Sequence, residues 1–170
     1  MTQSLLDRFE QTILPLLDDA YTFARHLLRD EHDAQDAVQE AYLRAWRHFG
    51  GFLGGDPRAW LLTIVRHCCY ASRRGGRKAE HVAYDDEQHT IESGSGYAAD
   101  ARAIGASERE NLESALEHLP AEFREALVLR ELEGLSYKDI ARVTGVPVGT
   151  VMSRLARARE RLRRVLKRTA

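Results

Sequence analysis

Arginine is concentrated in the last part of the chain, where it could bind a polyanion. Residues 148–170 hold eight basic residues and a single acid, Glu160. Five of these arginines recur at helical spacing along one side of the segment: Arg154, Arg157, Arg161, Arg164 and Arg168. Guanidinium groups bind phosphate oxygens and the O6/N7 edge of guanine. By itself, the pattern fits either a DNA-contacting helix or a solvated basic face.

The residues just before this segment favour DNA. Ser136 with Asp139 suits the start of one helix, Gly145 suits its end, and Pro147 suits the start of the next. The apolar residues that would pack the two helices together are Ile140, Val146 and Val151. This is the layout of a helix-turn-helix, whose second helix enters the major groove. The residues expected to contact DNA are Thr150, Ser153, Arg154, Arg157 and Arg161.

A second basic stripe follows Pro57. Residues 66–78 carry five basic side chains and no acid. Cationic and aromatic groups interleave on one face of the expected helix: Thr63, Arg66, His67, Tyr70, Arg73, Arg74 and Arg77. Such a face can follow a phosphate backbone and stack on exposed bases. A solvated basic face is the alternative that the pattern leaves open.

The expected helix after Asp30 has a buried side and an unusual outer side. Its apolar positions, mostly alanine, recur with helical spacing from Ala34 to Phe49. The other side presents three acids and a glutamine around one leucine: Asp33, Asp36, Gln39, Glu40 and Leu43. This side suits a protein partner with a basic, partly apolar helix. The alternative is a solvated acidic face, which is favourable near a helix N-terminus.

Catalytic and metal chemistry find little support. His32 with Asp36 has no third metal ligand at suitable spacing, and the adjacent Cys68 and Cys69 have no partner cysteines for a metal clip. We therefore expect no catalytic residue, no metal and no cofactor. Adjacent cysteines also exclude a disulfide framework, which fits a reducing, cytoplasmic location. No apolar run approaches the length of a membrane span, so no membrane insertion is expected.

The elements that carry these residues are all expected to be helices. The chain has 170 residues, of which 44% are apolar, enough for one ordinary domain or two small ones. Helical periodicity recurs and strand-like alternation does not, which predicts an all-α fold. The expected helices cover residues 5–29 (bent at Pro15), 31–49, 57–74, 107–118, 120–133, 136–144 and 147–167. Between the third and fourth of these expected helices lies an acidic stretch rich in Gly, Ser and Ala. We expect two small helical domains, residues 1–76 and 107–170, joined by a flexible acidic linker, residues 77–106.

Three segments resemble the sigma-70 family of transcription initiation factors. Residues 33–46 resemble region 2.2, residues 57–66 resemble regions 2.3 and 2.4, and residues 119–161 resemble region 4. A chain with only regions 2 and 4 and a short linker resembles the extracytoplasmic-function (ECF) subfamily. The sequence departs from the usual family pattern at Gln35, often an acid, and at His67, often an asparagine.

The resemblance implies a function without catalysis. Region 2.2, with Asp33, Asp36, Gln39, Glu40 and Leu43, would dock on the clamp helices of the largest subunit of core RNA polymerase. Region 2 would open the promoter and read its −10 element as a single strand through Phe52, Thr63, Arg66, His67, Tyr70, Arg73 and Arg74. Region 4 would read the −35 element as duplex and bind the flap of the second-largest subunit. Such factors are commonly held inactive by an anti-sigma factor, so that partner is also expected.

The rival hypothesis is a stand-alone helix-turn-helix regulator that acts without docking to polymerase. Its C-terminal half would look much the same. It would have no need of residues 31–76, which are the feature that discriminates the two hypotheses.

Overall fold

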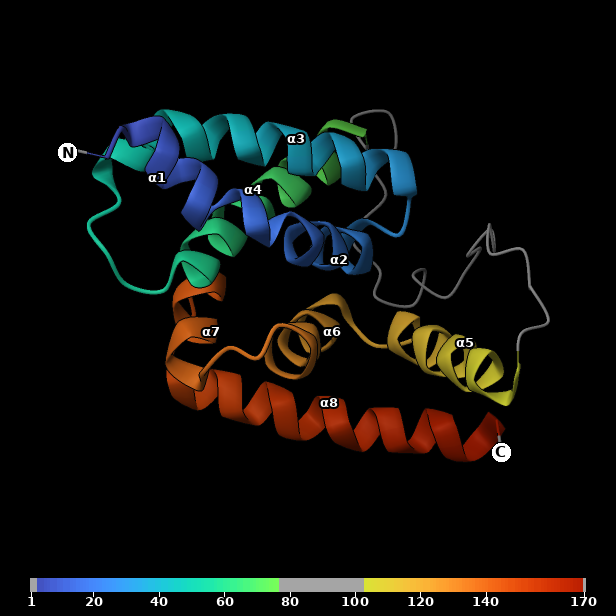
Figure 1. Ribbon diagram of the computed structural model, residues 1–170. Coiled ribbons are helices and arrows are strands. Elements are labelled where there is room, and N and C mark those ends of the chain that lie inside the picture. The colour runs from blue at the N-terminus through green and yellow to red at the C-terminus, as the bar shows by residue number, and fades with distance from the viewer. Residues whose placement is uncertain (1–2, 77–102, 170) are drawn as a thin grey trace.

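The computed structural model describes residues 3–76 and 103–169, and every regular element in these ranges is helical, which confirms the all-α expectation (Figure 1). The elements are α1 (Leu5–Thr12), η1 (Leu14–Leu16), α2 (Leu17–Leu28), α3 (Glu31–His48), η2 (Phe49–Gly51), α4 (Pro57–Gly76), α5 (Ala103–Glu117), α6 (Ala121–Leu127), η4 (Val128–Leu132), α7 (Tyr137–Thr144) and α8 (Val148–Thr169). The flexible linker expected from the sequence falls largely on residues 77–102, outside the described ranges.

Proline divides the first expected helix. Ser4 caps α1, its Oγ accepting a hydrogen bond from the Asp7 amide 3.0 Å away. The helix ends at Thr12, and the 3-10 turn η1 carries Pro15 before α2 begins. Proline has no amide hydrogen to donate to the preceding turn, which is why residues 5–29 form two helices rather than one bent helix.

Alanine lets α3 lie close to its neighbours. Asp30 caps this helix, its Oδ1 accepting from the Asp33 amide at 2.9 Å. Its buried residues are Ala34, Ala37, Val38, Ala41 and Ala45, which confirms the predicted inner face. This face packs against α2 and α4. A loop containing Gly54 and Gly55, both with positive φ, then leads into α4.

The second half differs from expectation at two places. Helix α5 begins at Ala103, four residues before its predicted start. The single helix expected over residues 120–133 is instead α6 followed by the π-helical turn η4. Gly134 follows this turn with φ 68°, a backbone conformation that residues with a side chain rarely adopt.

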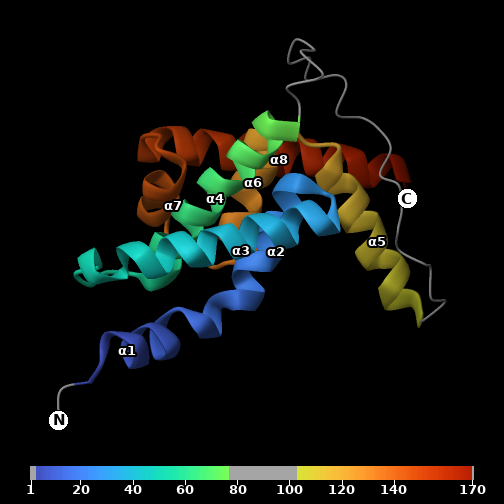
Figure 2. The same cartoon turned by 90° about the horizontal axis from the view of Figure 1, so that it is seen from above.

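The two halves pack directly on each other. Helix α4 lies against α7, α2 lies against α6, and α8 runs along the far side of α6 (Figure 1). Viewed from above, α1 extends away from the rest (Figure 2). Buried residues of both halves, from Phe9 to Ala158, belong to one apolar cluster. Among the described helices, none has the length and apolar character needed to cross a membrane.

Candidate nucleic-acid interface

Helices α7 and α8 form the helix-turn-helix that the sequence predicts. Ser136 Oγ accepts from the Asp139 amide at 3.1 Å and so caps α7. Gly145, with φ 72°, ends α7 in the left-handed conformation, its amide donating to Ala141. Ile140 and Val151 are buried between the helices. The turn residues thus fix the angle at which α8 leaves α7.

The outer side of α8 contains the arginines expected to contact DNA. Leu155 and Ala158 are buried, whereas Arg157 on the opposite side is exposed. Ser153 is also exposed, and its hydroxyl donates to the Thr150 carbonyl at 3.1 Å. The first turns of α8 therefore present a polar, basic edge to solvent.

Two of these arginines are engaged by α6. The side chain of Arg154 is 21% exposed and lies 3.8 Å from the Glu122 carboxylate. Arg161 lies over the ring of Phe123, with its guanidinium carbon 5.1 Å from the centroid. Glu122 is well exposed, so its contact with Arg154 is weak and open to competition by another anion.

The basic stripe on α4 divides between solvent and the second half. His67 and Arg74 are exposed. Thr63 is half-buried, and its hydroxyl donates to the Ala59 carbonyl at 2.8 Å. Arg66 and Tyr70 point instead into the interface with α6, so the stripe expected to form one DNA-binding face is partly covered here. The last member of the stripe, Arg77, lies outside the described ranges.

Arg66 and Tyr70 both donate to Glu125 of α6. Arg66 bonds the carboxylate through Nε and Nη2, and the Tyr70 hydroxyl lies 3.3 Å from Oε2. Arg66 also stacks 4.5 Å above the Tyr70 ring. Burial raises the pKa of Glu125, while the hydrogen bond and charge of Arg66 act to lower it. Burial, and secondarily the charge of Glu125, raises the pKa of Tyr70 to about 12.

Cations gather beside this contact. Arg124 is 3% exposed, and its pKa is lowered to about 10, first by burial and then by the charges of Arg29 and Arg73. Arg73 Nη1 and Arg124 Nε are buried without a hydrogen-bond partner in the described structure. Repulsion among these groups works against close packing of the two halves.

The outer face of α3 is acidic and partly apolar. Asp33, Asp36 and Gln39 are exposed there. Glu40 pairs with Arg44 at 3.0 Å, and Leu43 is 49% exposed. The structure thus places all five residues expected to contact a partner on accessible or half-accessible surface.

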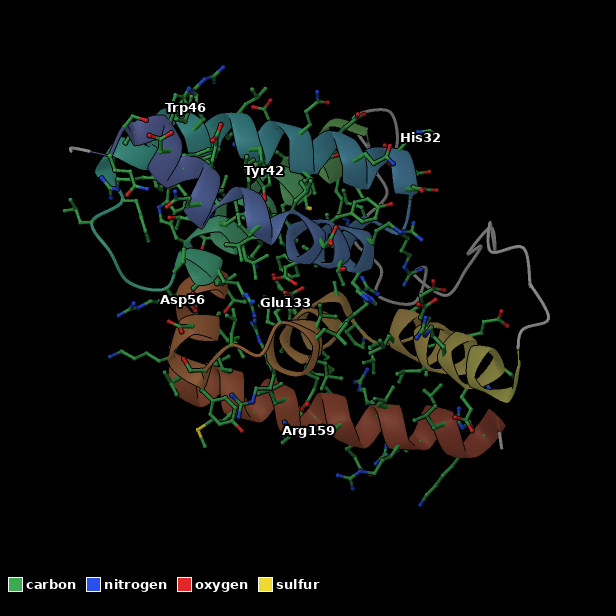
Figure 3. The ribbon with its side chains drawn as sticks, in the orientation of Figure 1. His32, Tyr42, Trp46, Asp56, Glu133 and Arg159 are labelled. Atoms are coloured by element: carbon green, nitrogen blue, oxygen red, sulfur yellow. The ribbon has the colours of Figure 1, made fainter. Side chains whose placement is uncertain are left out.

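Trp46 belongs with this face, although the sequence pattern did not single it out. Trp46, labelled in Figure 3, is 41% exposed. Its ring packs edge-on against that of Phe9, with centroids 5.3 Å apart. It follows Leu43 by three positions, the spacing that puts both on one side of a helix. That spacing could have identified it.

Phe52 and its neighbour Leu53 lie in different surroundings, although both belong to the loop before α4. Its ring stacks on Phe49, with centroids 5.9 Å apart, and lies 5.1 Å from Trp60. Leu53 is 95% exposed at the tip of the same loop. In this arrangement, Phe52, expected to contact the −10 element, is held in an aromatic cluster, and the loop tip is the accessible apolar group.

Contacts across the two halves involve residues that sequence reasoning missed. Arg58 donates across the interface to the Glu133 carbonyl at 2.7 Å, and within its own half it pairs with Asp19 at 3.2 Å. Glu133 is 2% exposed and lies between the two layers of helices (Figure 3). No periodicity could have identified these residues, because their partners are distant in the sequence. In the described ranges, no three His, Cys, Asp or Glu side chains are grouped to hold a metal ion.

Comparison with known proteins identifies the two halves. Residues 13–79 match the family described as Sigma-70 region 2, and residues 109–162 match Sigma-70, region 4. The chain is 33% identical over 165 residues to the ECF RNA polymerase sigma factor SigE of Mycolicibacterium smegmatis, covering 95% of this chain but only 62% of SigE. It is 35% identical over 163 residues to the ECF RNA polymerase sigma factor EcfG of Rhodopseudomonas palustris, covering 95% of this chain and 87% of EcfG.

A solved structure shows the same fold across both halves. The sigma factor RpoE of Bartonella quintana, crystallised with the anti-sigma factor NepR, has 33% sequence identity and a TM-score of 0.78. The superposition covers 94% of this chain and 97% of RpoE. The chain therefore belongs to the sigma-70 family, and within it to the ECF RNA polymerase sigma factors, the initiation factors that direct the polymerase to promoters.

Proposed function

We propose that the chain docks on core RNA polymerase through α3 and contacts promoter DNA through α4 and α8. One observation carries this proposal: α3 keeps an acidic outer face with Leu43 and Trp46 exposed, opposite its buried alanines. A stand-alone regulator would not need this face, and an apolar centre rimmed by charge is typical of protein interfaces. The partner would be a basic, partly apolar helix, as expected for the polymerase clamp helices.

The DNA contacts divide by chemistry. The first turns of α8, with half-buried Thr150 and exposed Ser153 and Arg157, would enter the major groove of the −35 element. Arg161 lies further along and would meet a phosphate. On α4, Arg66, His67 and Tyr70 would bind the opened −10 strand by stacking and charge. The proposed function has no covalent step, so specificity comes from binding alone.

The proposal extends to regulation and location. The similar sigma factor RpoE of Bartonella quintana forms a complex with the anti-sigma factor NepR. We propose that this chain likewise has an anti-sigma partner, and that it acts in the cytoplasm, where the polymerase is.

The test is reconstitution with purified core polymerase. The tagged full-length chain should co-elute with the core enzyme and support start-specific run-off transcription from a pool of genomic fragments. Tight binding of the chain to a promoter duplex, without co-elution or transcription, would instead establish a stand-alone regulator.

A further inference from the structure

We propose that Arg29, Arg73 and Arg124 form a binding site for a phosphate group, where the end of α2 meets α4 and α6. The ligand would be a small phosphate-bearing compound rather than a nucleic acid. This inference goes beyond the proposed function, which gives Arg29 and Arg124 no role. It requires no separation of the two halves, whose buried residues share one apolar cluster.

The three arginines come from separate helices and act on one another through their charges. Arg29 follows α2, Arg73 belongs to the last turn of α4, and Arg124 lies on α6. After the larger effect of burial, the charges of Arg29 and Arg73 lower the pKa of Arg124. The charge of Glu117 opposes that shift, but one carboxylate does not balance three guanidinium groups. A bound anion would balance the excess positive charge.

Two donors of the cluster are buried and lack an acceptor. Arg124 is 3% exposed, and its Nε has no hydrogen-bond partner among the residues that the structure describes. The same holds for Nη1 of Arg73. Nη1 of Arg124 reaches the Leu119 carbonyl only at 3.4 Å. A charged donor that loses water and gains no acceptor destabilises the fold, whereas phosphate oxygens would accept from both nitrogens.

Arg29 has an unusual backbone conformation and donates across to the second half. Its φ is 64°, and in residues 3–76 and 103–169 no other residue except glycine has a positive φ. Arg25 donates to the Arg29 carbonyl at 2.6 Å, and Arg29 Nη2 donates to the Glu117 carbonyl. Backbone strain of this kind persists where surrounding contacts fix it, and it is common at ligand-binding positions. These contacts position Arg29 before any ligand arrives.

The burial of the cluster favours a small ligand. Arg29 and Arg73 are half-buried, whereas Arg124 is almost completely buried. A free phosphate group could pass the two half-buried side chains and reach Arg124. In a DNA strand each phosphate is flanked by sugars, so the strand could reach the half-buried arginines but not Arg124. Guanidinium groups suit this ligand because their paired N–H donors match the spacing of phosphate oxygens.

The experiment measures binding of inorganic phosphate and of pyrophosphate to the full-length chain by isothermal titration calorimetry, at an ionic strength held constant with sodium chloride. Urea unfolding provides a second readout, with anions kept below about 10 mM so that the general stabilising effect of phosphate stays small. Arg124→Gln removes the most buried donor, and Arg29→Gln is the second variant should the first fail to fold. The matched control is Arg163→Gln, which removes an exposed charge of α8 that pairs with Glu160. Arg73 is left unchanged because it is also expected to contact the −10 strand.

Wild type and Arg163→Gln should bind at least one of the two anions saturably. Their free energy of unfolding should then rise by about 1.4 kcal/mol for each tenfold increase in anion concentration above Kd. Arg124→Gln and Arg29→Gln should each weaken binding about tenfold or more, because each removes charge-assisted hydrogen bonds. Absence of saturable binding to the wild type would overturn the inference, and so would equal binding by wild type and both cluster variants.

A labelled single-stranded oligonucleotide tests nucleic acid as the other source of phosphate. Fluorescence anisotropy should show the same oligonucleotide affinity for Arg124→Gln as for wild type. A loss of oligonucleotide binding equal to the loss of anion binding would assign the cluster to DNA and overturn the small-ligand inference.

Discussion

Arg58 of α4 donates to the main-chain carbonyl of Glu133, 2.7 Å away, and so ties the first half of the chain to the second. Among the residues that the structure describes, Oε2 of Glu133 is buried and has no hydrogen-bond partner. Burial, reinforced by the charge of Asp19 and opposed by that of Arg58, raises the pKa of Glu133 to about 7. A proton on this carboxyl is therefore part of the packed state.

This pKa predicts that the packed state gains stability as pH falls. The folded pKa lies above the ordinary value of 4.5, so the contribution is fully present below pH 4.5 and is lost as pH rises through about 7. Between those values the free energy of unfolding should fall by up to about 1.4 kcal/mol per pH unit from this group. Glu133→Gln should remove that dependence in urea unfolding measured from about pH 5 to pH 8.

His26 should change the stability with pH in the opposite direction to Glu133. Burial, with the charges of Arg124 and Arg25, lowers its pKa to about 4, so it destabilises the fold as pH falls below 6.5. The two groups oppose each other in the range they share. The difference between Glu133→Gln and wild type cancels the His26 contribution, and a difference that does not vary with pH would contradict the assignment to Glu133.

Charge reversal on α3 should weaken polymerase binding. Asp36→Lys with Glu40→Lys places repulsion where a basic partner helix is expected, and losing one buried interfacial charge can cost roughly 2–5 kcal/mol. Core affinity, measured by competition with the wild-type factor, should fall while helix content stays the same. Glu108→Lys with Glu110→Lys makes the same charge change on exposed positions of α5 and should leave affinity unchanged. Equal losses in both pairs would mean that only net charge matters.

Arg154 and Arg157 should determine which upstream sequences are used. An arginine bidentate to guanine is worth about 1–3 kcal/mol of discrimination at one base pair. Transcription of a promoter library by Arg154→Ala and Arg157→Ala factors should show relaxed preference at separate positions. Arg163→Ala removes an exposed charge further along α8, where it pairs with Glu160, and should leave the ranking of sequences intact. If all three variants keep the wild-type ranking, other residues read the bases.

Ser136, which caps α7, should support DNA binding only by stabilising the helix-turn-helix. Ser136→Ala removes the acceptor for the Asp139 amide and should cost about 1 kcal/mol of stability. Ser4→Ala removes the equivalent cap from α1 and should cost about the same. Only the first should weaken duplex binding by the polymerase complex, because α7 packs against α8, whereas α1 belongs to the first half of the chain. A loss of duplex binding in Ser4→Ala would show a general effect of stability.

The sequence predicts local structure better than contacts between distant parts. The alanine spacing of α3 and the Ser136 and Gly145 signals of the helix-turn-helix depend on neighbouring residues, and the structure confirms them. Glu125 gave no such signal, because an acid in a helix is ordinarily solvated. Its partner Arg66 is 59 positions away, and periodicity within either helix contains no information about that pairing.

The packing of helix α4 limits which substitutions the chain can accept in evolution. One side of it packs on α2 and α3, and another side packs on α7, while Arg66 and Tyr70 would also face nucleic acid. A substitution at these positions must therefore satisfy two environments rather than one. We expect α4 to tolerate fewer substitutions in a saturation library than α5, whose residues from Ser107 to Leu112 face solvent.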